Sequence, residues 1–266
     1  MNILMVTTSA SMLPPNHPTG LWLDEFAVPY DYFITHGAHV TVASPLGGAV
    51  PLDPKTEPSD SERIKWFGAL RALESSKSLA GIDDSFFDAL FIPGGHGPIV
   101  DLVHDRDLHR LIASFEEDGK FIGAVCHGPA ALLEVRGADG HYLIRDRRLT
   151  GFSNLEERLA GMHAKVPFLL EDELKKRGAR YESALLPMTS HVIRDGNLIT
   201  GQNPASSARV AEEFMNGLQR NIELFEELGL RDGASQITEP GAMRHGGRAE
   251  ADMASGGTRP TVWPGY

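Results

Sequence analysis

The segment that most constrains the fold is an apolar run, residues 121–125, which is followed directly by Cys126-His127-Gly128-Pro129. An uninterrupted apolar run of this length is typical of a strand that is buried on both faces, as in a parallel sheet. Pro129 favours the first turn of a helix, because its missing N–H needs no partner there. We therefore predict a strand that ends at Val125, a sharp turn at Cys126 and a helix that begins near Pro129.

Cys126 is the only cysteine in the chain, and its neighbours favour a catalytic role. A free cysteine is more often a small buried hydrophobe. Here a histidine follows it, and Gly123 and Gly128 leave room for close approach of the backbone. The N–H groups at a helix N-terminus stabilise negative charge, so we expect Cys126 to titrate below the usual thiol pKa of about 8.5.

A second apolar run ends in a glycine turn, at Pro93-Gly94-Gly95-His96-Gly97. Ligands of open α/β sheets bind beyond the carboxyl ends of the strands. Two such strand ends, one carrying a thiol and one a Gly-Gly turn, are therefore expected to meet in one crevice.

Apolar periodicity along the rest of the chain alternates between strands and helices. An Asp-Gly pair at residues 195–196 predicts a β-hairpin. This pattern predicts a flavodoxin-like α/β sandwich of three layers, with a mostly parallel central sheet and helices on both faces. The expected strands are residues 2–8, 40–44, 89–92, 121–125 and 148–152, and the expected helices are residues 23–34, 108–119 and 167–177 and a helix that begins at Asn203.

The composition predicts one catalytic domain, residues 1–230, followed by a Gly- and Pro-rich tail, residues 231–266, which we expect to be flexible. A formal net charge of −11 lacks the basic footprint of a nucleic-acid partner and disfavours anionic membrane surfaces. One cysteine cannot form an internal disulfide, and no long apolar run is present, so we expect a cytoplasmic protein. No H-E-x-x-H, Walker or G-x-G-x-x-G motif occurs, and we expect neither a metal nor another cofactor.

Three motifs together resemble the ThiJ/PfpI superfamily, which is related to class I glutamine amidotransferase domains: residues 124–129, 93–97 and 199–207. Two further segments, residues 19–25 and 151–157, resemble the branch of fungal heat-shock glyoxalase III proteins. The resemblance covers residues 1 to about 225.

The resemblance implies a role for each matching residue. Cys126 is the implied nucleophile, with His127 beside it and Glu25 as the carboxyl group next to the thiol. Glu157 is the implied acidic partner of the histidine, although Glu156 matches almost as well. The Gly94–Gly95 turn is implied to supply N–H donors to the reacting oxygen. Without the motif, Glu25 would be read as a solvated charge favoured by the start of a helix.

The implied activity is that of a glyoxalase III-like lyase. It converts a small carbonyl substrate, methylglyoxal, to a 2-hydroxy acid without a cofactor, through a thiohemiacetal on Cys126. Several alternatives stay open: an amidase, peptidase or deglycase that uses the same thiol, a stress-response holding chaperone, and a redox sensor. The sequence also leaves open whether the chain forms a homodimer.

Overall fold

The structure is a computed structural model, which describes residues 1–227. The expected tail, residues 231–266, lies outside the described residues. The strands are β1 (Asn2–Val6), β2 (Met12–Leu13), β3 (His17–Pro18), β4 (His39–Ser44), β5 (Lys77–Ser78), β6 (Ala89–Ile92), β7 (Phe121–Val125), β8 (Arg148–Leu149), β9 (Arg180–Tyr181), β10 (Val192–Asp195) and β11 (Leu198–Gly201). The α-helices are α1 (Leu23–Thr35), α2 (Asp60–Lys65), α3 (Phe67–Leu73), α4 (Arg106–Glu117), α5 (Asn154–Leu159), α6 (Leu170–Lys176) and α7 (Ser207–Glu227).

The central sheet has seven strands in the order β10-β11-β7-β6-β1-β4-β5. All neighbouring strands pair in parallel except β10 and β11, which form an antiparallel hairpin. Gly196, with φ 62°, lies in the hairpin turn, where a positive φ favours glycine. The flavodoxin-like α/β architecture and the hairpin that the sequence predicts are both confirmed.

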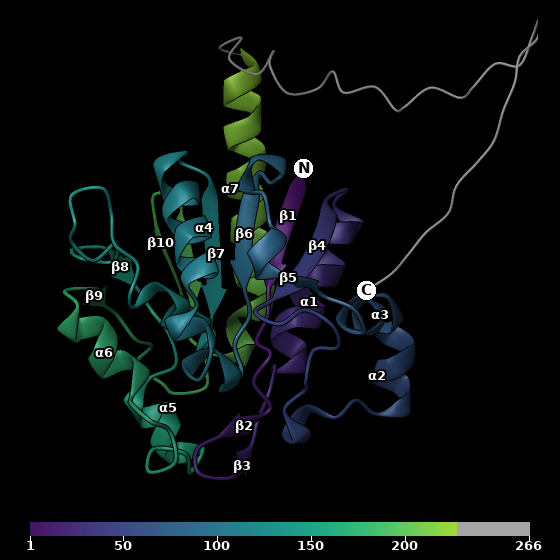
Figure 1. Cartoon of the computed structure of the whole chain (residues 1–266), viewed down its shortest axis with the longest axis vertical. Helices are drawn as coiled ribbons and strands as arrows, with labels where there is room; N and C mark the ends of the chain where they lie inside the picture. Colours follow the sequence, from purple (N-terminus) through teal and green to yellow (C-terminus); the bar gives the residue numbers. More distant parts are fainter. Residues whose placement is uncertain (228–266) are drawn as a thin grey trace, which may run out of the picture. The chain divides into compact units, whose positions relative to one another are not determined.

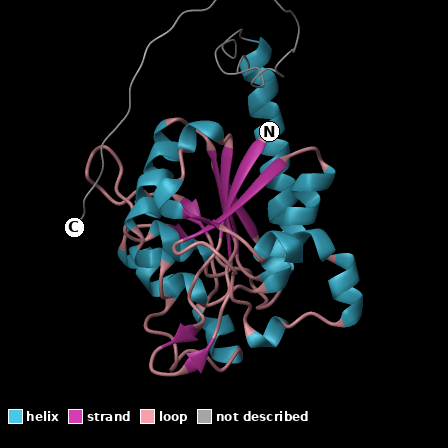
Figure 2. Cartoon of the chain, turned by 45° about the vertical axis from the view of Figure 1, so that its right-hand side comes forward, coloured by secondary structure: helices cyan, strands magenta, loops and turns pink. Residues whose placement is uncertain are grey.

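Helices cover both faces of the sheet, and each face has its own apolar core (Figures 1 and 2). Successive strand residues point to opposite faces. Leu4 and Val6 of β1 therefore pack in the core that contains α4, whereas Ile3 and Met5 pack in the core that contains α1 and α7. Burial on both sides explains why these strands are apolar without interruption.

Two expected elements differ from the structure. The strand expected at residues 148–152 stops at Leu149 and pairs with β9 outside the central sheet. The backbone N–H groups that follow are used elsewhere, since Thr150 donates to Thr200 Oγ1 (2.9 Å) and Phe152 donates to the Cys126 carbonyl (2.8 Å). The helix expected after Cys126 is a 3₁₀-helix of five residues, Gly128–Leu132.

Helices α2 and α3 were not expected from the periodicity. The signal for the first of them is a capping box, in which Ser59 Oγ accepts from the Glu62 N–H and the Glu62 carboxylate accepts from the Ser59 N–H.

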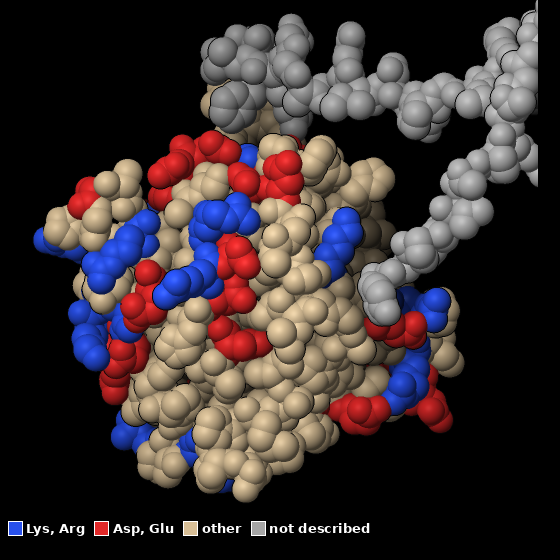
Figure 3. Space-filling model, in the orientation of Figure 1, with Lys and Arg blue, Asp and Glu red and all other residues tan. Residues whose placement is uncertain are grey.

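The parallel strands place their carboxyl ends at one edge of the sheet. In Figure 1 the chain enters at the top of β1, so this edge lies in the lower half, where α5 and the β2–β3 pair also lie. In Figure 3 the visible face carries Lys and Arg side chains next to Asp and Glu, without an extended basic surface on that face. Among the described helices, none is long and apolar enough to cross a membrane.

Candidate active site

Cys126 lies at the elbow between β7 and the 3₁₀-helix, with φ 60°. A non-glycine residue in this left-handed region is strained, and the surrounding structure must hold it there. Two backbone hydrogen bonds do so: Cys126 N–H donates to the Gly201 carbonyl (2.9 Å), and its carbonyl accepts from Phe152 N–H. A Cβ on Gly128 would lie 2.3 Å from the Ile92 carbonyl oxygen, so only glycine allows the chain to pass β6 this closely. This turn presents the sulfur at the carboxyl edge of the sheet.

Glu25, in the first turn of α1, is completely buried beside the thiol. Its Oε2 accepts a hydrogen bond from Gly94 N–H (2.9 Å), and its carboxyl group interacts with Cys126. Burial raises the pKa of Glu25 to about 8, although the hydrogen bonds from Cys126 and the glycine turn oppose this rise. Glu25 is therefore protonated at neutral pH, and it can donate a proton inside the site.

The thiol of Cys126 does not have the lowered pKa that the sequence led us to expect. Burial, followed by the charge of Glu25, raises its pKa well above the usual value, and only the Gly95 N–H among these neighbours opposes the rise. The expected helix dipole is weak because the following segment is a single short 3₁₀-helix. A reaction that used this sulfur as a nucleophile would require a neighbouring base to remove the thiol proton.

His127 is placed to be that base. Its Nδ1 lies 3.4 Å from Cys126 Sγ, and its Nε2 lies 2.7 Å from Glu157 Oε2. Burial favours the protonated form of Glu157, but the charges and hydrogen bonds of His127 and His96 outweigh it and hold the pKa of Glu157 well below its usual range. An ionised carboxylate only accepts hydrogen bonds, so His127 Nε2 carries a proton and Nδ1 presents its lone pair to the thiol.

The structure separates the two adjacent glutamates that the sequence left as alternatives. Glu157 turns into the site, while Glu156 forms the capping box of α5 with Ser153. Glu156 also accepts hydrogen bonds from Met188 N–H and Asn203 Nδ2, both at 2.8 Å. Glu156 therefore has its oxygens occupied by structural donors, and Glu157 is the acidic residue that contacts the cavity histidines.

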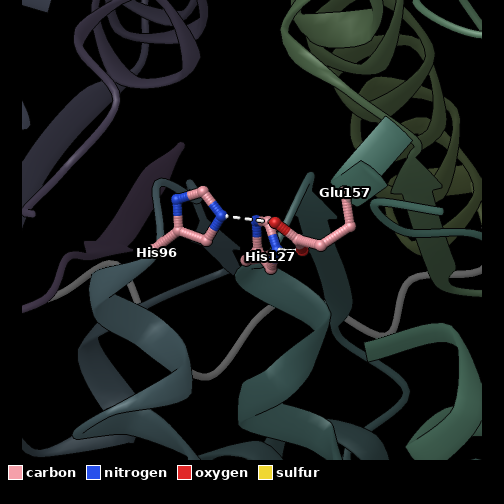
Figure 4. Close-up of side chains that lie close together, drawn as sticks. All are labelled: His96, His127 and Glu157. Carbon is pink, nitrogen blue, oxygen red and sulfur yellow. Dashed lines mark hydrogen bonds and ion pairs between the residues drawn. The ribbon is translucent and has the colours of Figure 1, made fainter. Parts of the chain in front are cut away.

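His96 belongs to the same cluster, although the sequence alone did not single it out as a site residue. It is buried, its Nε2 lies 2.8 Å from Glu157 Oε1, and its ring centroid lies 4.3 Å from that of His127. Figure 4 shows the Glu157 carboxylate next to both imidazole rings. The signal that could have found His96 is its position directly after the Gly94–Gly95 turn at a strand end.

The same three side chains are the one group within the described residues that could hold a metal ion. Their ligand atoms lie within 4.8 Å of one another, and two imidazoles with one carboxylate suit a divalent transition metal. Here each Nε2 atom is hydrogen-bonded to one oxygen of the Glu157 carboxylate.

The two N–H groups of the Gly94–Gly95 turn do not both face the cavity as free donors, contrary to what the sequence led us to expect. Gly94 N–H donates to Glu25, so it is not available to a substrate oxygen. Gly95 N–H lies against the Cys126 sulfur and the Glu25 carboxyl group. Gly95 has φ 85°, and a Cβ there would lie 2.2 Å from the Gly20 carbonyl oxygen. Of the two N–H groups, that of Gly95 is the one that also lies against the sulfur.

A small cavity of about 120 Å³ opens onto the thiol. Its wall is mostly apolar, and one exposed cation, Lys55, lies at its edge. A water molecule occupies roughly 30 Å³ of liquid, so the cavity has room for a ligand of only a few heavy atoms. The lining residues are Trp22, Lys55, Gly95, His96, Cys126, His127, Phe152, Ala160, Met188 and Pro204.

A doubly wound sheet with a cysteine on a strained strand-to-helix elbow, flanked by a carboxyl group and an imidazole, defines a class of cysteine-centred α/β proteins. Within that class, this chain belongs to the DJ-1/PfpI family, whose model matches residues 22–217.

Individual relatives refine this assignment. The chain is 26% identical over 215 residues to Glyoxalase 3 of Candida albicans. This match covers 76% of this chain and 91% of that protein. The crystal structure of glyoxalase III from Candida albicans has a TM-score of 0.73 at 25% identity and covers 81% of this chain and 96% of its own. Rapid Encystment Protein 24 KDa of Francisella tularensis has a TM-score of 0.77 at 36% identity and covers 82% and 98%. Protein/nucleic acid deglycase HchA of Pseudomonas aeruginosa is 31% identical over 209 residues, which are 72% of this chain and 69% of that protein.

Proposed function

We propose that this protein is a cofactor-independent glyoxalase, a lyase that converts small 2-oxoaldehydes such as methylglyoxal to 2-hydroxy acids, with Cys126 as the nucleophile. One observation carries the proposal: the Cys126 sulfur contacts both the buried carboxyl group of Glu25 and the imidazole of His127, and it lines a cavity of about 120 Å³. The relatives named glyoxalase 3 and glyoxalase III support the same substrate class.

Attack is the first step. The Cys126 sulfur adds to the aldehyde carbon while His127 Nδ1 removes the thiol proton, and Glu157 balances the imidazolium charge that forms. Gly95 N–H stabilises the developing oxyanion. Glu25, protonated at neutral pH, donates a proton to that oxygen and so yields a thiohemiacetal.

Proton transfer between the two carbons follows. Glu25 and His127 carry the C1 proton to the ketone oxygen, which gives an enediol, and then carry the C1 hydroxyl proton to C2. The product of this isomerisation is a thioester between Cys126 and the 2-hydroxy acid. Water hydrolyses the thioester and regenerates the thiol.

The test is turnover of methylglyoxal by the purified full chain, without glutathione and after treatment with EDTA. Wild type is expected to form lactate under these conditions. Cys126→Ser should reduce turnover to background, because a hydroxyl is far less acidic and less nucleophilic than a thiol. A wild-type protein that is inactive on small oxoaldehydes, or a fully active Cys126→Ser variant, would refute the proposal.

A deglycase activity is the second candidate, favoured by the similarity to HchA. The substrates of the two activities differ in size. A glycated amino acid is larger than the cavity of about 120 Å³ next to Cys126. Release of free amine from glycated N-acetyl-lysine, at a rate comparable with methylglyoxal turnover, would favour the deglycase.

A further inference from the structure

His96 is a buried cavity residue that the steps above do not use. It lines the same cavity as Cys126, and its Nε2 lies 2.8 Å from Glu157 Oε1. Because the ionised carboxylate only accepts hydrogen bonds, Nε2 is the protonated nitrogen of His96. The other ring nitrogen, Nδ1, then carries the lone pair.

The two cavity histidines differ in which nitrogen is free. His127 is occupied on both sides, by the Cys126 sulfur at Nδ1 and by Glu157 at Nε2. His96 Nδ1 has no hydrogen-bond partner among the described residues, and it is not enclosed by protein atoms. In the structure, His96 is therefore the one of these two imidazoles with a ring nitrogen that no described residue occupies.

The charge balance of the cluster disfavours a positive charge on His96. One carboxylate, Glu157, can compensate only one imidazolium, and the rings of His96 and His127 lie 4.3 Å apart. Burial, followed by the charge of His127, lowers the pKa of His96, and the hydrogen bond and charge of Glu157 and the charge of Asp53 oppose this. A neutral imidazole whose Nε2–H is held by a carboxylate is the arrangement of a general base.

We infer that His96 is the catalytic base that activates water for hydrolysis of the acyl-Cys126 thioester. This inference rests on the proposed function, and it assigns the one step for which that mechanism names no base. His96 Nδ1 removes a proton from water as the water oxygen bonds to the thioester carbonyl carbon. The C–S bond then breaks, its electron pair goes to sulfur, and the proton taken by His96 returns to the sulfur. Thioester and water thus give carboxylic acid and thiol.

The alternative is that His96 only positions Glu157, and two substitutions distinguish the roles. His96→Gln places an amide N–H near the position of Nε2, so it keeps a donor to Glu157 but has no basic nitrogen. His96→Ala removes both. If His96 only positions Glu157, the Gln variant should behave like wild type. If His96 is the base, both variants should be impaired in hydrolysis.

The experiment separates acylation from hydrolysis with p-nitrophenyl acetate, an activated ester that can acylate the thiol without the glyoxalase steps. For His96→Gln we expect a burst of one p-nitrophenolate per Cys126, as in wild type, followed by a steady-state rate that is lower by about 100-fold. Intact-protein mass spectrometry should show the acetyl group retained on the variant. Hydroxylamine, a stronger nucleophile than water, should release it.

Controls and contrary results are defined by the same assay. His109→Gln, on α4 away from the cavity, should leave burst and steady state unchanged. His96→Asn is the second variant should Gln not be accommodated in the buried site. Hydrolysis by the Gln and Asn variants at near the wild-type rate would overturn the inference, as would a wild-type protein that forms no acetyl adduct. Loss of methylglyoxal activity alone, with the ester results as expected, would instead refute the proposed function and leave the role of His96 intact.

Discussion

Replacement of Glu25 by glutamine should stabilise the protein at neutral and alkaline pH while it removes activity. The Glu25→Gln side chain would keep an oxygen that accepts from Gly94 N–H, but it has no charge to bury and no proton to exchange. Below pH 4.5 both the folded and unfolded states hold the Glu25 proton. As the pH rises, the unfolded chain releases it while the folded protein keeps it until about pH 8, so unfolding becomes progressively easier.

The magnitude follows from the two pKa values. Between pH 4.5 and about 8, wild type loses stability from this group at about 1.4 kcal/mol per pH unit, which amounts to roughly 5 kcal/mol across the window. The free energy of unfolding of Glu25→Gln minus that of wild type should therefore increase with pH by this amount. The difference between variants cancels the other titrating groups that they share.

The assay is urea denaturation of both proteins at a series of pH values from about 5 to 8, with Glu212→Gln as a baseline variant that removes an exposed carboxylate. Turnover of methylglyoxal by Glu25→Gln, measured in parallel, should decrease by about 100-fold or more. A stability difference that does not change with pH would mean that Glu25 is ionised at neutral pH, and the proton-donor role assigned to it would then be wrong.

Two other perturbations test the geometry of the site. Gly95→Ala should destabilise the protein by roughly 3 kcal/mol or more, because at φ 85° its Cβ would lie 2.2 Å from a backbone oxygen. The control is Gly140→Ala, which has φ 77° and open space around its Cβ and should cost only about 1 kcal/mol in the same denaturation assay. Equal costs for the two variants would contradict the clash. Glu156→Gln should lower the free energy of unfolding by about 1–3 kcal/mol, because it places an amide against hydrogen-bond donors. Glu157→Gln should mainly lower kcat, by about 100-fold. The reverse pattern would exchange the roles of the two glutamates.

The sequence by itself predicted most of the central sheet, because the signals for it are local. The uninterrupted apolar runs at β1, β6 and β7 are what strands buried on both faces require, and the Asp-Gly turn predicted the β10–β11 hairpin. The sharp turn at Cys126 was also predictable from residues that are adjacent in sequence, since Cys126-His127-Gly128-Pro129 follows a strand directly. The short 3₁₀-helix after it, in contrast, depends on how closely that segment packs against β6.

Only the tertiary structure decided how the site works, because its interactions join residues that are far apart in sequence. Gly94 N–H binds Glu25 across 69 positions, and His96 meets Glu157 across 61. The periodicity of the sequence does not indicate which of the two adjacent glutamates points into the site. Glu156 forms a capping box with Ser153, and Glu157 contacts the histidines. Burial likewise reversed the expected direction of the Cys126 pKa, because the free energy of a charge depends on the solvent and groups that the folded chain places around it.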